Sequence, residues 1–355
     1  MEPIEANNSI IYFDHNGYAA LNSYIGNGNF SKIFILVDEN THTHCLAHFM
    51  SKLAADITIE VIEIEAGEIH KTIETCSGVW QSLSELDADR KSLMINVGGG
   101  VVTDLGGFVA CTFKRGINYI NVPTTLLSMV DASVGGKTGV DLGHLKNQIG
   151  VISSPDIIII DTQYLVTLPN NQMKSGLAEM LKHGLISDFN YWNKFNDLSN
   201  LKLDDLEGLI YESVLIKKGV VDQDPYEDNL RKTLNFGHTL GHAIESYFLS
   251  NSKKPDLLHG EAIAIGMVLA SYISVQLTKF PEKDANHIKT ILKNFYGHVN
   301  ISEEEYATIM DLLKYDKKNA HGNINFVLLE AIGKPKIDCI VPDNIIIEAF
   351  KYYAT

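Results

Sequence analysis

The first half of the chain alternates short apolar runs, which are typical of buried strands, with segments whose apolar residues recur at helical spacing. The strand-like runs lie at residues 32–38, 57–65, 91–97 and 157–161. Segments with helical spacing lie between them, at residues 39–53 and from about residue 71 to residue 86. Strands that alternate with helices in this order form a parallel sheet covered by helices on both faces. We therefore predict an α/β fold, in which residues 1–169 form a doubly wound, Rossmann-like domain with a parallel sheet.

The pattern changes after Pro169. The following segments are long and mostly helical in period, with one β-like pair near residues 324–332 and 336–341. The longest apolar stretch, residues 262–275, is too short and too interrupted to span a bilayer, so it predicts a buried helix. Residues 170–355 are therefore expected to form a second, mostly α-helical domain.

A polar stripe follows one face of a helix that would span residues 230–248, "LRKTLNFGHTLGHAIESYF". At positions i, i+4, i+7 and i+11 the helix would carry Arg231, Asn235, His238 and His242. An ordinary surface helix turns an apolar stripe to the core, so four hydrogen-bonding side chains in one line need partners of another kind. Gly237 and Gly241 lie beside the two histidines and would let another backbone approach them.

The segment "MINVGGGVVTDLGGF" predicts a strand, a glycine turn and the start of a helix. The glycines at 98–100 let the backbone come close to a ligand, and the helix N-terminus offers N–H groups and a positive dipole end to a phosphate. A plain tight turn is the alternative explanation. Asp104, in the first turn of the helix, could equally stabilise the helix dipole.

A second glycine-rich segment, residues 122–150, is denser in polar groups. In chain order it carries Thr124, Thr125, Asp131, Gly135, Gly136, Lys137, Thr138, Lys146 and Asn147. Glycines beside a lysine suit phosphate binding, because backbone amides and a mobile cation are both at hand. The spacing differs from that of a Walker A loop. A flexible, solvated loop is the alternative.

Carboxylate and imidazole side chains beyond residue 170 could bind a metal ion. Glu179 together with two histidines drawn from His238, His242 and His259 would give the three-ligand zinc arrangement with one open position that catalysis uses. The local pattern does not choose between the histidines. Taken alone, Glu179 and Lys182 at i, i+3 favour a surface ion pair.

Charge and composition narrow the class of protein. Arg231, and Lys217 on the preceding helix, are cations near the predicted metal and indicate an anionic substrate. The net charge of −15 argues against non-specific nucleic-acid binding. The four cysteines are far apart and suggest neither a disulfide framework nor a thiolate metal site. The acidic N-terminus lacks the basic and apolar regions of a signal peptide, so we expect a cytoplasmic protein without membrane contact.

Five blocks in order closely resemble the 3-dehydroquinate synthase family of the sugar phosphate cyclases, over about residues 60–333. They are "GGGVVTDLGGF", "FKRGINYINVPTTLLSMVDASVGGKTGV", "SGLAEMLKHG", "LRKTLNFGHTLGHAIE" and "LLHGEAIAIGM". The resemblance implies an NAD-binding first domain, a metal- and substrate-binding second domain, and an active site in the cleft between them. It also implies zinc or cobalt as the metal and a homodimer as the assembly.

The resemblance implies roles for individual residues. The matching metal ligands are Glu179, His238 and His259, which leaves His242 to handle protons. The positions that match NAD contacts are Gly67, Glu68, Lys71, Gly99, Gly100, Val101, Val102, Thr103, Asp104, Thr124, Thr125, Lys137 and Lys146. The positions that match the substrate pocket are Asp131, Lys137, Asn147, Lys182, Lys217, Arg231, Asn235 and His242. Arg115 matches an arginine that reaches across the dimer interface, and Lys317 matches a lysine near the phosphate, with Lys318 equally placed.

The implied substrate is 3-deoxy-D-arabino-heptulosonate 7-phosphate, an anionic sugar phosphate. In the implied reaction NAD transiently oxidises the C5 hydroxyl, which acidifies the neighbouring C6 proton. Phosphate is eliminated, the hydride returns to C5, and an aldol step closes the ring to 3-dehydroquinate. The polar stripe would then be the pocket wall. This is a carbon–oxygen lyase step of the shikimate pathway.

Three departures and three alternatives accompany the resemblance. Thr103 and Asp141 replace a glycine and an asparagine of the family's common pattern, and the usual proline and glycine before Lys146 are absent. One alternative is a cyclase for a substrate without a carboxylate, which the retained Arg231 and Lys217 disfavour. A metal-dependent alcohol dehydrogenase shares the two-domain plan, but the segment "VDASVGGKTGV" argues against it. A silent binding protein would lack ligands, and none is missing.

Overall fold

The structure is a computed structural model that describes residues 1–6, 8–143, 145–198, 201–251, 254–255, 257–313 and 324–355. The chain divides into two compact units. The first unit, called unit 1, comprises Met1–Pro169 and Leu206–Lys218, and the second, unit 2, comprises Asn170–Asp205 and Gly219–Thr355. Each unit has its own core and is described separately.

Unit 1 is built on a seven-stranded sheet with the order β1-β2-β9-β6-β5-β3-β4. The strands are β1 Ile4–Ala6, β2 Ser9–Phe13, β3 Ile33–Asp38, β4 Ile59–Ile64, β5 Leu93–Gly98, β6 Asn118–Pro123 and β9 Ile157–Ile160. All neighbouring strands pair in parallel except β1 and β2. The four predicted strands are confirmed. β1, β2 and β6 were not predicted, because β1 is short and β6 runs without a break into the polar segment that follows it.

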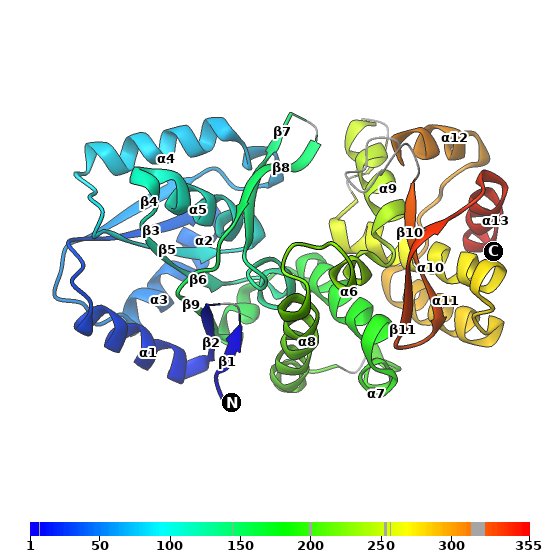
Figure 1. Cartoon of the computed structure of the whole chain (residues 1–355), viewed down its shortest axis with the longest axis horizontal. Helices are drawn as coiled ribbons and strands as arrows, with labels where there is room; N and C mark the ends of the chain where they lie inside the picture. The colour runs from blue at the N-terminus through cyan, green and yellow to red at the C-terminus, as the bar shows by residue number, and fades with distance from the viewer. Residues whose placement is uncertain (7, 144, 199–200, 252–253, 256, 314–323) are drawn as a thin grey trace. The chain divides into compact units, whose positions relative to one another are not determined.

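Helices cover both faces of this sheet, as predicted for a doubly wound fold (Figure 1). They are α1 Asp14–Asn27, α2 Glu39–Thr41, η1 His42–Leu46, α3 Ala47–Lys52, η2 Glu68–His70, α4 Ile73–Glu85, α5 Gly100–Thr112 and η3 Phe113–Arg115. α4 and α5 share one face, where their apolar side chains join those of β3 and β5 in one buried core. α5 lies close to the sheet because Gly106 has no side chain: a Cβ there would come within 2.0 Å of Asn96 Oδ1.

The dense polar segment folds into a hairpin, so its interpretation as a flexible loop is wrong. η4 Ser128–Ala132 precedes the antiparallel strands β7 Lys137–Leu142 and β8 Leu145–Ile152. Gly139 pairs with Gly150, and a Cβ on Gly139 would come within 2.3 Å of the Ile149 carbonyl oxygen. Sequence reasoning missed the hairpin because glycine has low strand propensity, whereas here close backbone approach requires it.

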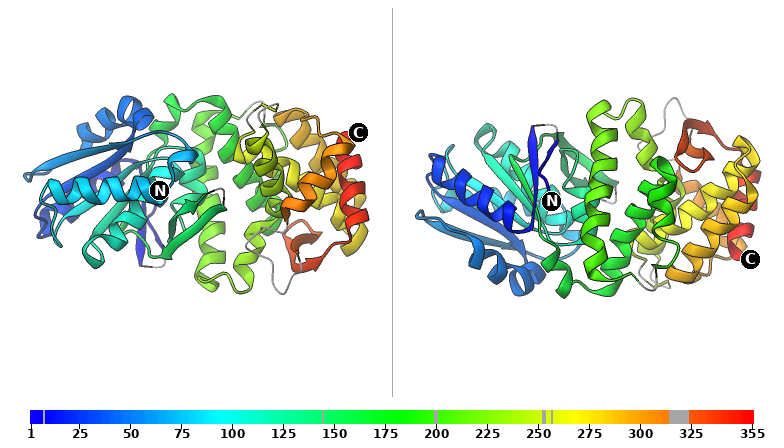
Figure 2. Two further views of the ribbon diagram at one scale, coloured as in Figure 1. Left: turned by 90° about the horizontal axis from the view of Figure 1, so that it is seen from above. Right: turned by 90° about the horizontal axis from the view of Figure 1, so that it is seen from below.

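Unit 2 is mostly helical, as predicted. Its helices are α6 Asn170–Ser187, α7 Phe189–Asn193, η7 Leu230–Asn235, α9 His238–Ser250, α10 His259–Thr278, α11 Glu282–Tyr296, α12 Glu303–Leu312 and α13 Asp343–Ala354. α8 Leu203–Gln223 belongs to both units, since its residues Leu206–Lys218 pack with unit 1. The predicted β pair is confirmed as β10 Asn325–Ala331 and β11 Lys334–Ile340, an antiparallel ribbon at the margin of the unit (Figure 2).

α10 is the central helix of unit 2 and packs against α6, α9, α11, α13 and β10. At 20 residues it is longer than the predicted apolar stretch and long enough to cross a membrane, but most of it is buried inside the unit. The prediction of a buried helix is therefore confirmed.

The helix predicted over residues 230–248 is interrupted. η7 ends at Asn235, Gly237 adopts a left-handed conformation with φ 78°, and α9 begins at His238. Arg231 and Asn235 therefore lie on a different element from His238 and His242, and the single stripe of four is wrong. Gly237 permits the break, because glycine adopts a positive φ without the steric cost that a side chain brings. The polar stripe of α9 instead continues from His238 and His242 to Glu245, at i, i+4 and i+7.

Candidate functional site

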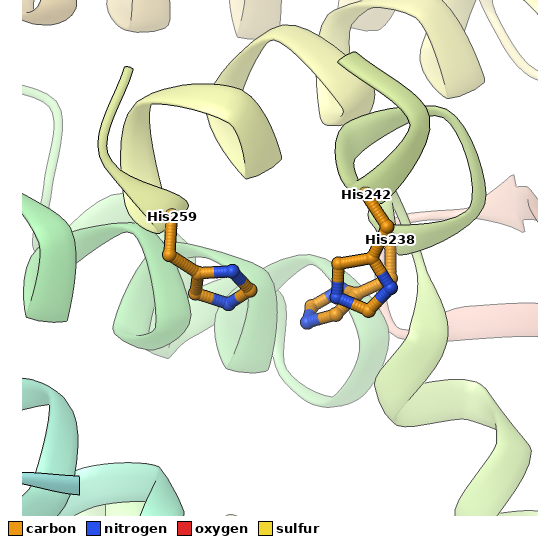
Figure 3. Close-up of side chains that lie close together, drawn as sticks. All are labelled: His238, His242 and His259. Atoms are coloured by element: carbon orange, nitrogen blue, oxygen red, sulfur yellow. The ribbon is translucent and has the colours of Figure 1, made fainter. Parts of the chain in front are cut away.

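Three histidines from two helices of unit 2 converge. His238 and His242 come from the first turns of α9, and His259 is the first residue of α10. Figure 3 shows their imidazole rings facing one another, and each ring offers a nitrogen within 4.8 Å of the others. This spacing is suited to binding one metal ion.

Glu179 from α6 completes this cluster and singles out two of the histidines. Its Oε1 atom lies 3.4 Å from Nε2 of His238 and 3.7 Å from Nε2 of His259. This oxygen is buried and makes no hydrogen bond of ordinary geometry within the described part of the chain. A buried carboxylate oxygen is costly without a partner, so the arrangement suits a cation held between the oxygen and the two nitrogens. Glu179, His238 and His259 thus fit the implied metal as its ligands.

Glu179 and Lys182 form an ion pair that is fully buried, so their interpretation as a surface pair is wrong. Burial alone would raise the pKa of Glu179, but the charges of Lys182 and His238 hold it well below its ordinary value. Burial lowers the pKa of His259, and the nearby carboxylates of Glu245 and Glu179 outweigh this and raise it to about 9. The cluster is a concentrated set of charges inside a helical core.

Close helix contacts bring these side chains together. The Gly260 N–H donates to Ser175 Oγ at 3.0 Å, and a Cβ on Gly260 would come within 2.4 Å of Ser175 Cα. This contact sets the start of α10, and with it His259, against the helix that carries Glu179. α9 and α10 approach as closely: a Cβ on Gly266 would lie 2.0 Å from the Gly237 carbonyl oxygen. A Cβ on Gly237 would lie 2.9 Å from Met267 N and one on Gly241 would lie 3.1 Å from Ala262 O, so the prediction that the glycines beside the histidines let another backbone approach is confirmed.

Arg231 and Asn235 are held by the loop before η7. Arg231 is buried, its backbone N–H donates to Asp224 Oδ2 at 2.9 Å, and its Nη1 donates to the Pro225 carbonyl at 2.7 Å. Asn235 donates through Nδ2 to Glu227 Oε1 at 2.5 Å. Their side chains thus have protein partners that sequence reasoning did not foresee, and these partners orient them.

In unit 1 the glycine turn lies at the carboxyl end of β5, where an open α/β sheet binds its ligands. Gly99 caps α5 without any side-chain cap, so the first N–H groups of the helix point at the turn. The Thr103 hydroxyl, which replaces a family glycine, donates to the Gly99 carbonyl at 3.2 Å and is also 3.2 Å from Ser128 Oγ. This departure therefore leaves the turn intact. A Cβ on Gly99 would lie 3.0 Å from Thr125 Cγ2.

Lys71 links α5, the helix that follows the glycine turn, to the hairpin of β7 and β8. Its buried Nζ donates to Asp104 Oδ2 at 2.6 Å and to Asn147 Oδ1 at 2.7 Å. Burial lowers the pKa of Lys71, but the carboxylates of Asp104 and Glu68 outweigh this and raise it above its ordinary value. Asp104 is therefore an ion-pair partner, and because α5 begins at Gly100, its predicted place in the first turn of the helix is wrong.

Asp141, which replaces a family asparagine, has a structural role in the hairpin. Its Oδ1 accepts the backbone N–H of Asn147 at 2.6 Å, while Asn147 has a left-handed φ of 52°. This bond and the one from Lys71 together fix Asn147 within β8.

Lys217, from the part of α8 that packs with unit 1, is buried and donates to Asp131 Oδ1 at 2.6 Å and to the Asp131 carbonyl. These two predicted site residues are thus brought together. Lys146 lies 3.7 Å from Glu68 Oε1. Arg115 is exposed with a left-handed φ of 69°, and Gly67 and Lys137 are exposed as well. Lys317 and Lys318 lie outside the described residues.

Sequence reasoning missed two acidic residues beside these groups. Asp38 ends β3, next to β5 in the sheet, and accepts the Thr41 N–H at 2.7 Å. An acid at the end of a strand beside a glycine turn is a signal for binding ribose hydroxyls, and it could have been read from "FILVDEN". Glu245 lies three residues after His242 on the same helix face, beyond the end of the predicted polar stripe.

With a parallel α/β sheet in one unit and a Glu–His–His cluster in the other, the chain has the architecture of a sugar phosphate cyclase. It superposes on a solved structure of 2-deoxy-scyllo-inosose synthase, complexed with carbaglucose-6-phosphate, NAD⁺ and Co²⁺, with a TM-score of 0.83, 26% identity and 99% of both chains covered. Residues 61–175 match the 3-dehydroquinate synthase N-terminal family, and residues 176–319 match the 3-dehydroquinate synthase C-terminal family. The chain belongs to the 3-dehydroquinate synthase family.

Full-length relatives agree with this assignment. The chain is 40% identical over 335 residues to 3-dehydroquinate synthase of Parabacteroides distasonis, with 94% of each chain covered. It is 40% identical over 305 residues to 3-dehydroquinate synthase of Methylacidiphilum infernorum, covering 86% of this chain and 83% of the relative. The family consists of lyases, so the chain is an enzyme by descent.

Proposed function

We propose that the protein converts 3-deoxy-D-arabino-heptulosonate 7-phosphate to 3-dehydroquinate and phosphate, as a carbon–oxygen lyase of the shikimate pathway. The observation that carries the proposal is the buried cluster of Glu179, His238 and His259, in which Glu179 Oε1 has no hydrogen bond among the described residues and lies 3.4 and 3.7 Å from two imidazole nitrogens. Such a cluster suits a divalent metal in a pocket for an anionic, hydroxyl-rich substrate. Residues 1–169 are proposed as the NAD-binding domain and residues 170–355 as the metal- and substrate-binding domain.

Two groups would complete the site. Zinc or cobalt, held by Glu179, His238 and His259, would supply Lewis acidity toward a substrate hydroxyl. NAD, held at the glycine turn between β5 and α5, would supply a reversible hydride acceptor. The uncapped N-terminus of α5 fits a pyrophosphate, and Asp38 at the end of β3 fits the ribose hydroxyls.

The chain's own residues bind and orient the substrate. Lys182 and Arg231 supply positive charge toward the carboxylate and phosphate, and the Asn235 amide can hydrogen bond to a hydroxyl. His242 lies beside the proposed metal ligands, with its ring centroid 5.1 Å from that of His238, and it is proposed to move protons. Lys217, Asp131 and Asn147 in unit 1 are proposed to contact the same substrate.

The remaining expectations become part of the proposal. The 2-deoxy-scyllo-inosose synthase structure contains NAD⁺, Co²⁺ and a phosphorylated sugar analogue, and this supports the cofactors proposed here. We propose a homodimer in which the exposed Arg115 reaches the partner's site, and a cytoplasmic location. Lys317 or Lys318 is proposed to contact the phosphate.

A single assay tests the reaction. Purified protein is incubated with the seven-carbon keto-acid phosphate and NAD at the concentration of the enzyme, while phosphate, 3-dehydroquinate and reduced nicotinamide absorbance are followed. We expect many turnovers of phosphate release without accumulation of reduced cofactor, because the hydride is returned within each cycle. A dehydrogenase would instead accumulate one reduced cofactor per product and stop. Glucose 6-phosphate, which lacks the carboxylate, should not release phosphate.

A further inference from the structure

Glu245 is a buried acid that none of the roles above uses. It lies on α9 one turn beyond His242, and its side chain is 5% exposed. Carboxylates are rarely buried in a helical core unless a charged or hydrogen-bonded partner compensates them. Its Oε2 atom lies 3.2 Å from Nδ1 of His259, across the close contact between α9 and α10.

The contact with Glu245 decides which nitrogen of His259 is available to bind a metal. An imidazole that binds a metal through one nitrogen usually donates the other N–H to a carboxylate or carbonyl, and this fixes both tautomer and ring orientation. With Nδ1 engaged by Glu245, Nε2 faces Glu179 Oε1, 3.7 Å away, and is the nitrogen left to bind a metal. His238 has the same arrangement: its Nδ1 lies 3.2 Å from the Phe236 carbonyl, and its Nε2 lies 3.4 Å from the same Glu179 oxygen.

The two acceptors differ in charge. The Phe236 carbonyl belongs to the backbone at the break before α9, whereas Glu245 brings a full negative charge into the core. A carboxylate acceptor makes the imidazole a stronger donor to a metal, and the charge itself favours a divalent cation nearby. Without a metal Glu245 still pairs with His259, so its effect on metal affinity has to be measured separately from its effect on stability.

We propose that Glu245 is the positioning residue for His259: it holds the imidazole with Nε2 toward the metal and strengthens that nitrogen as a ligand. The proposal rests on the proposed metal site of Glu179, His238 and His259. It predicts that Glu245 controls metal affinity without touching the metal, the Glu179 ligand or the substrate.

The test measures Zn²⁺ affinity of the purified full-length protein by competition with a chromogenic chelator, with Glu245→Gln, Glu245→Met and Glu245→Asp compared with the unchanged chain. Outer partners of ligating histidines typically contribute about 10- to 100-fold to metal affinity. We expect Glu245→Gln, which keeps the shape and a neutral acceptor, to weaken Zn²⁺ binding by about tenfold. Glu245→Met, which keeps neither acceptor nor charge, should weaken it by about 100-fold. Glu245→Asp should bind between the unchanged chain and Glu245→Met.

Matched controls separate positioning from simple packing. Glu305→Gln changes another hydrogen-bonded carboxylate of unit 2, a partly exposed one, which accepts from Tyr247 and Lys254 and lies outside the cluster. It should leave Zn²⁺ affinity unchanged even if it lowers the melting temperature of the metal-free protein. Co²⁺ added in place of Zn²⁺ gives a second readout, since its visible absorption bands should change in the Glu245 variants and not in Glu305→Gln.

The outcomes also separate this proposal from the proposed function. If Glu179→Ala loses metal while Glu245→Gln and Glu245→Met bind Zn²⁺ within threefold of the unchanged chain, the positioning role is overturned and the metal site stands. Equal losses of affinity in Glu245→Gln and Glu305→Gln overturn it as well. If Glu179→Ala keeps its metal, the ligand set itself is wrong. Should Glu245→Met fail to fold, the isosteric Glu245→Gln still decides.

Discussion

Replacing Gly266 with alanine should damage both the stability of unit 2 and its metal site. The added Cβ would lie 2.0 Å from the Gly237 carbonyl oxygen and 2.9 Å from the Gly241 nitrogen. Ordinary contact begins at 3.4 Å, so α9 and α10 must separate by up to 1.4 Å at this point. Both obstructing atoms belong to the backbone, so no side chain can rotate away.

The magnitude follows from that separation. Inserting a methyl group into a packed interior costs about 1–3 kcal/mol, and the rigid contact here places the cost at the upper end, about 3 kcal/mol. For a unit of this size such a loss lowers the melting temperature by about 10 °C. Metal sites tolerate deviations of about 0.2 Å in ligand distances. If the separation of the helices moves His238 away from His259 by about 1 Å, Zn²⁺ binding should weaken by about tenfold or more.

Calorimetry of the metal-free protein and a chelator titration measure the two effects. Gly219→Ala is the control, because a Cβ at this position of α8 meets nothing within 4 Å. Alanine there should stabilise the helix by about 0.5–1 kcal/mol and leave the metal affinity unchanged. If Gly266→Ala melts within about 2 °C of the unchanged chain and keeps its Zn²⁺ affinity, then the close approach of α9 and α10 does not constrain the site, and this reasoning fails.

Three further predictions test other parts of the molecule. Glu179→Ala should remove the bound metal, whereas His242→Ala should keep the metal and slow turnover. Metal content per subunit is measured, and loss of metal in the His242 variant alone would reverse the ligand assignment. Arg231→Met should raise KM for the sugar phosphate, and because Arg231 also binds the Pro225 carbonyl, it should lower stability by about 1–3 kcal/mol; a large loss of stability with KM unchanged would make Arg231 purely structural. Burial, with the charges of Glu207 and Asp161, raises the pKa of Asp14 from 3.8 to about 6. The folded state therefore binds more protons than the unfolded state between these values, so the Asp14 contribution to stability is present below pH 3.8 and is lost as the pH rises through 6. Asp14→Asn, which suits the left-handed φ of 50°, should melt higher than the unchanged chain at pH 8 and about equally near pH 4, and a constant difference across this range would contradict the shift.

Much of the fold follows from local patterns. The β-branched runs of β3, β5 and β9 are strands whatever surrounds them, since each is short, apolar and bounded by polar residues or turns. The alternation with helices then selects a parallel sheet, and the change of period after Pro169 selects a helical remainder. The hairpin of β7 and β8 was not foreseeable in this way, because its glycines are required by the contact of two backbones and not by local propensity.

The residue types of the site were also readable from the sequence, because metal and phosphate chemistry need carboxylates, imidazoles and cations in few combinations. The hydrogen-bond and ion-pair partners of these residues were not readable from the sequence. A 3.6-residue period extended across Phe236 and Gly237 joins Arg231 to His242 on one face, but the left-handed glycine starts a new helix and gives Arg231 a different partner. The buried state of the Glu179–Lys182 pair likewise depends on the helices packed around α6.

The roles proposed for the three histidines depend on the tertiary structure and could not be inferred from the spacing of the residues. Spacing made His238 and His242 equivalent candidates, and His259 lay on a separate segment. Only the packing of α6, α9 and α10 places Nε2 of His238 and His259 against one oxygen of Glu179, with Glu245 and a backbone carbonyl behind them. The sequence alone therefore determined which chemical groups are present and which elements carry them. The proposed choice of ligands rests on contacts between residues up to 80 positions apart, because hydrogen bonds and coordination depend on distances of a few ångströms that no local period encodes.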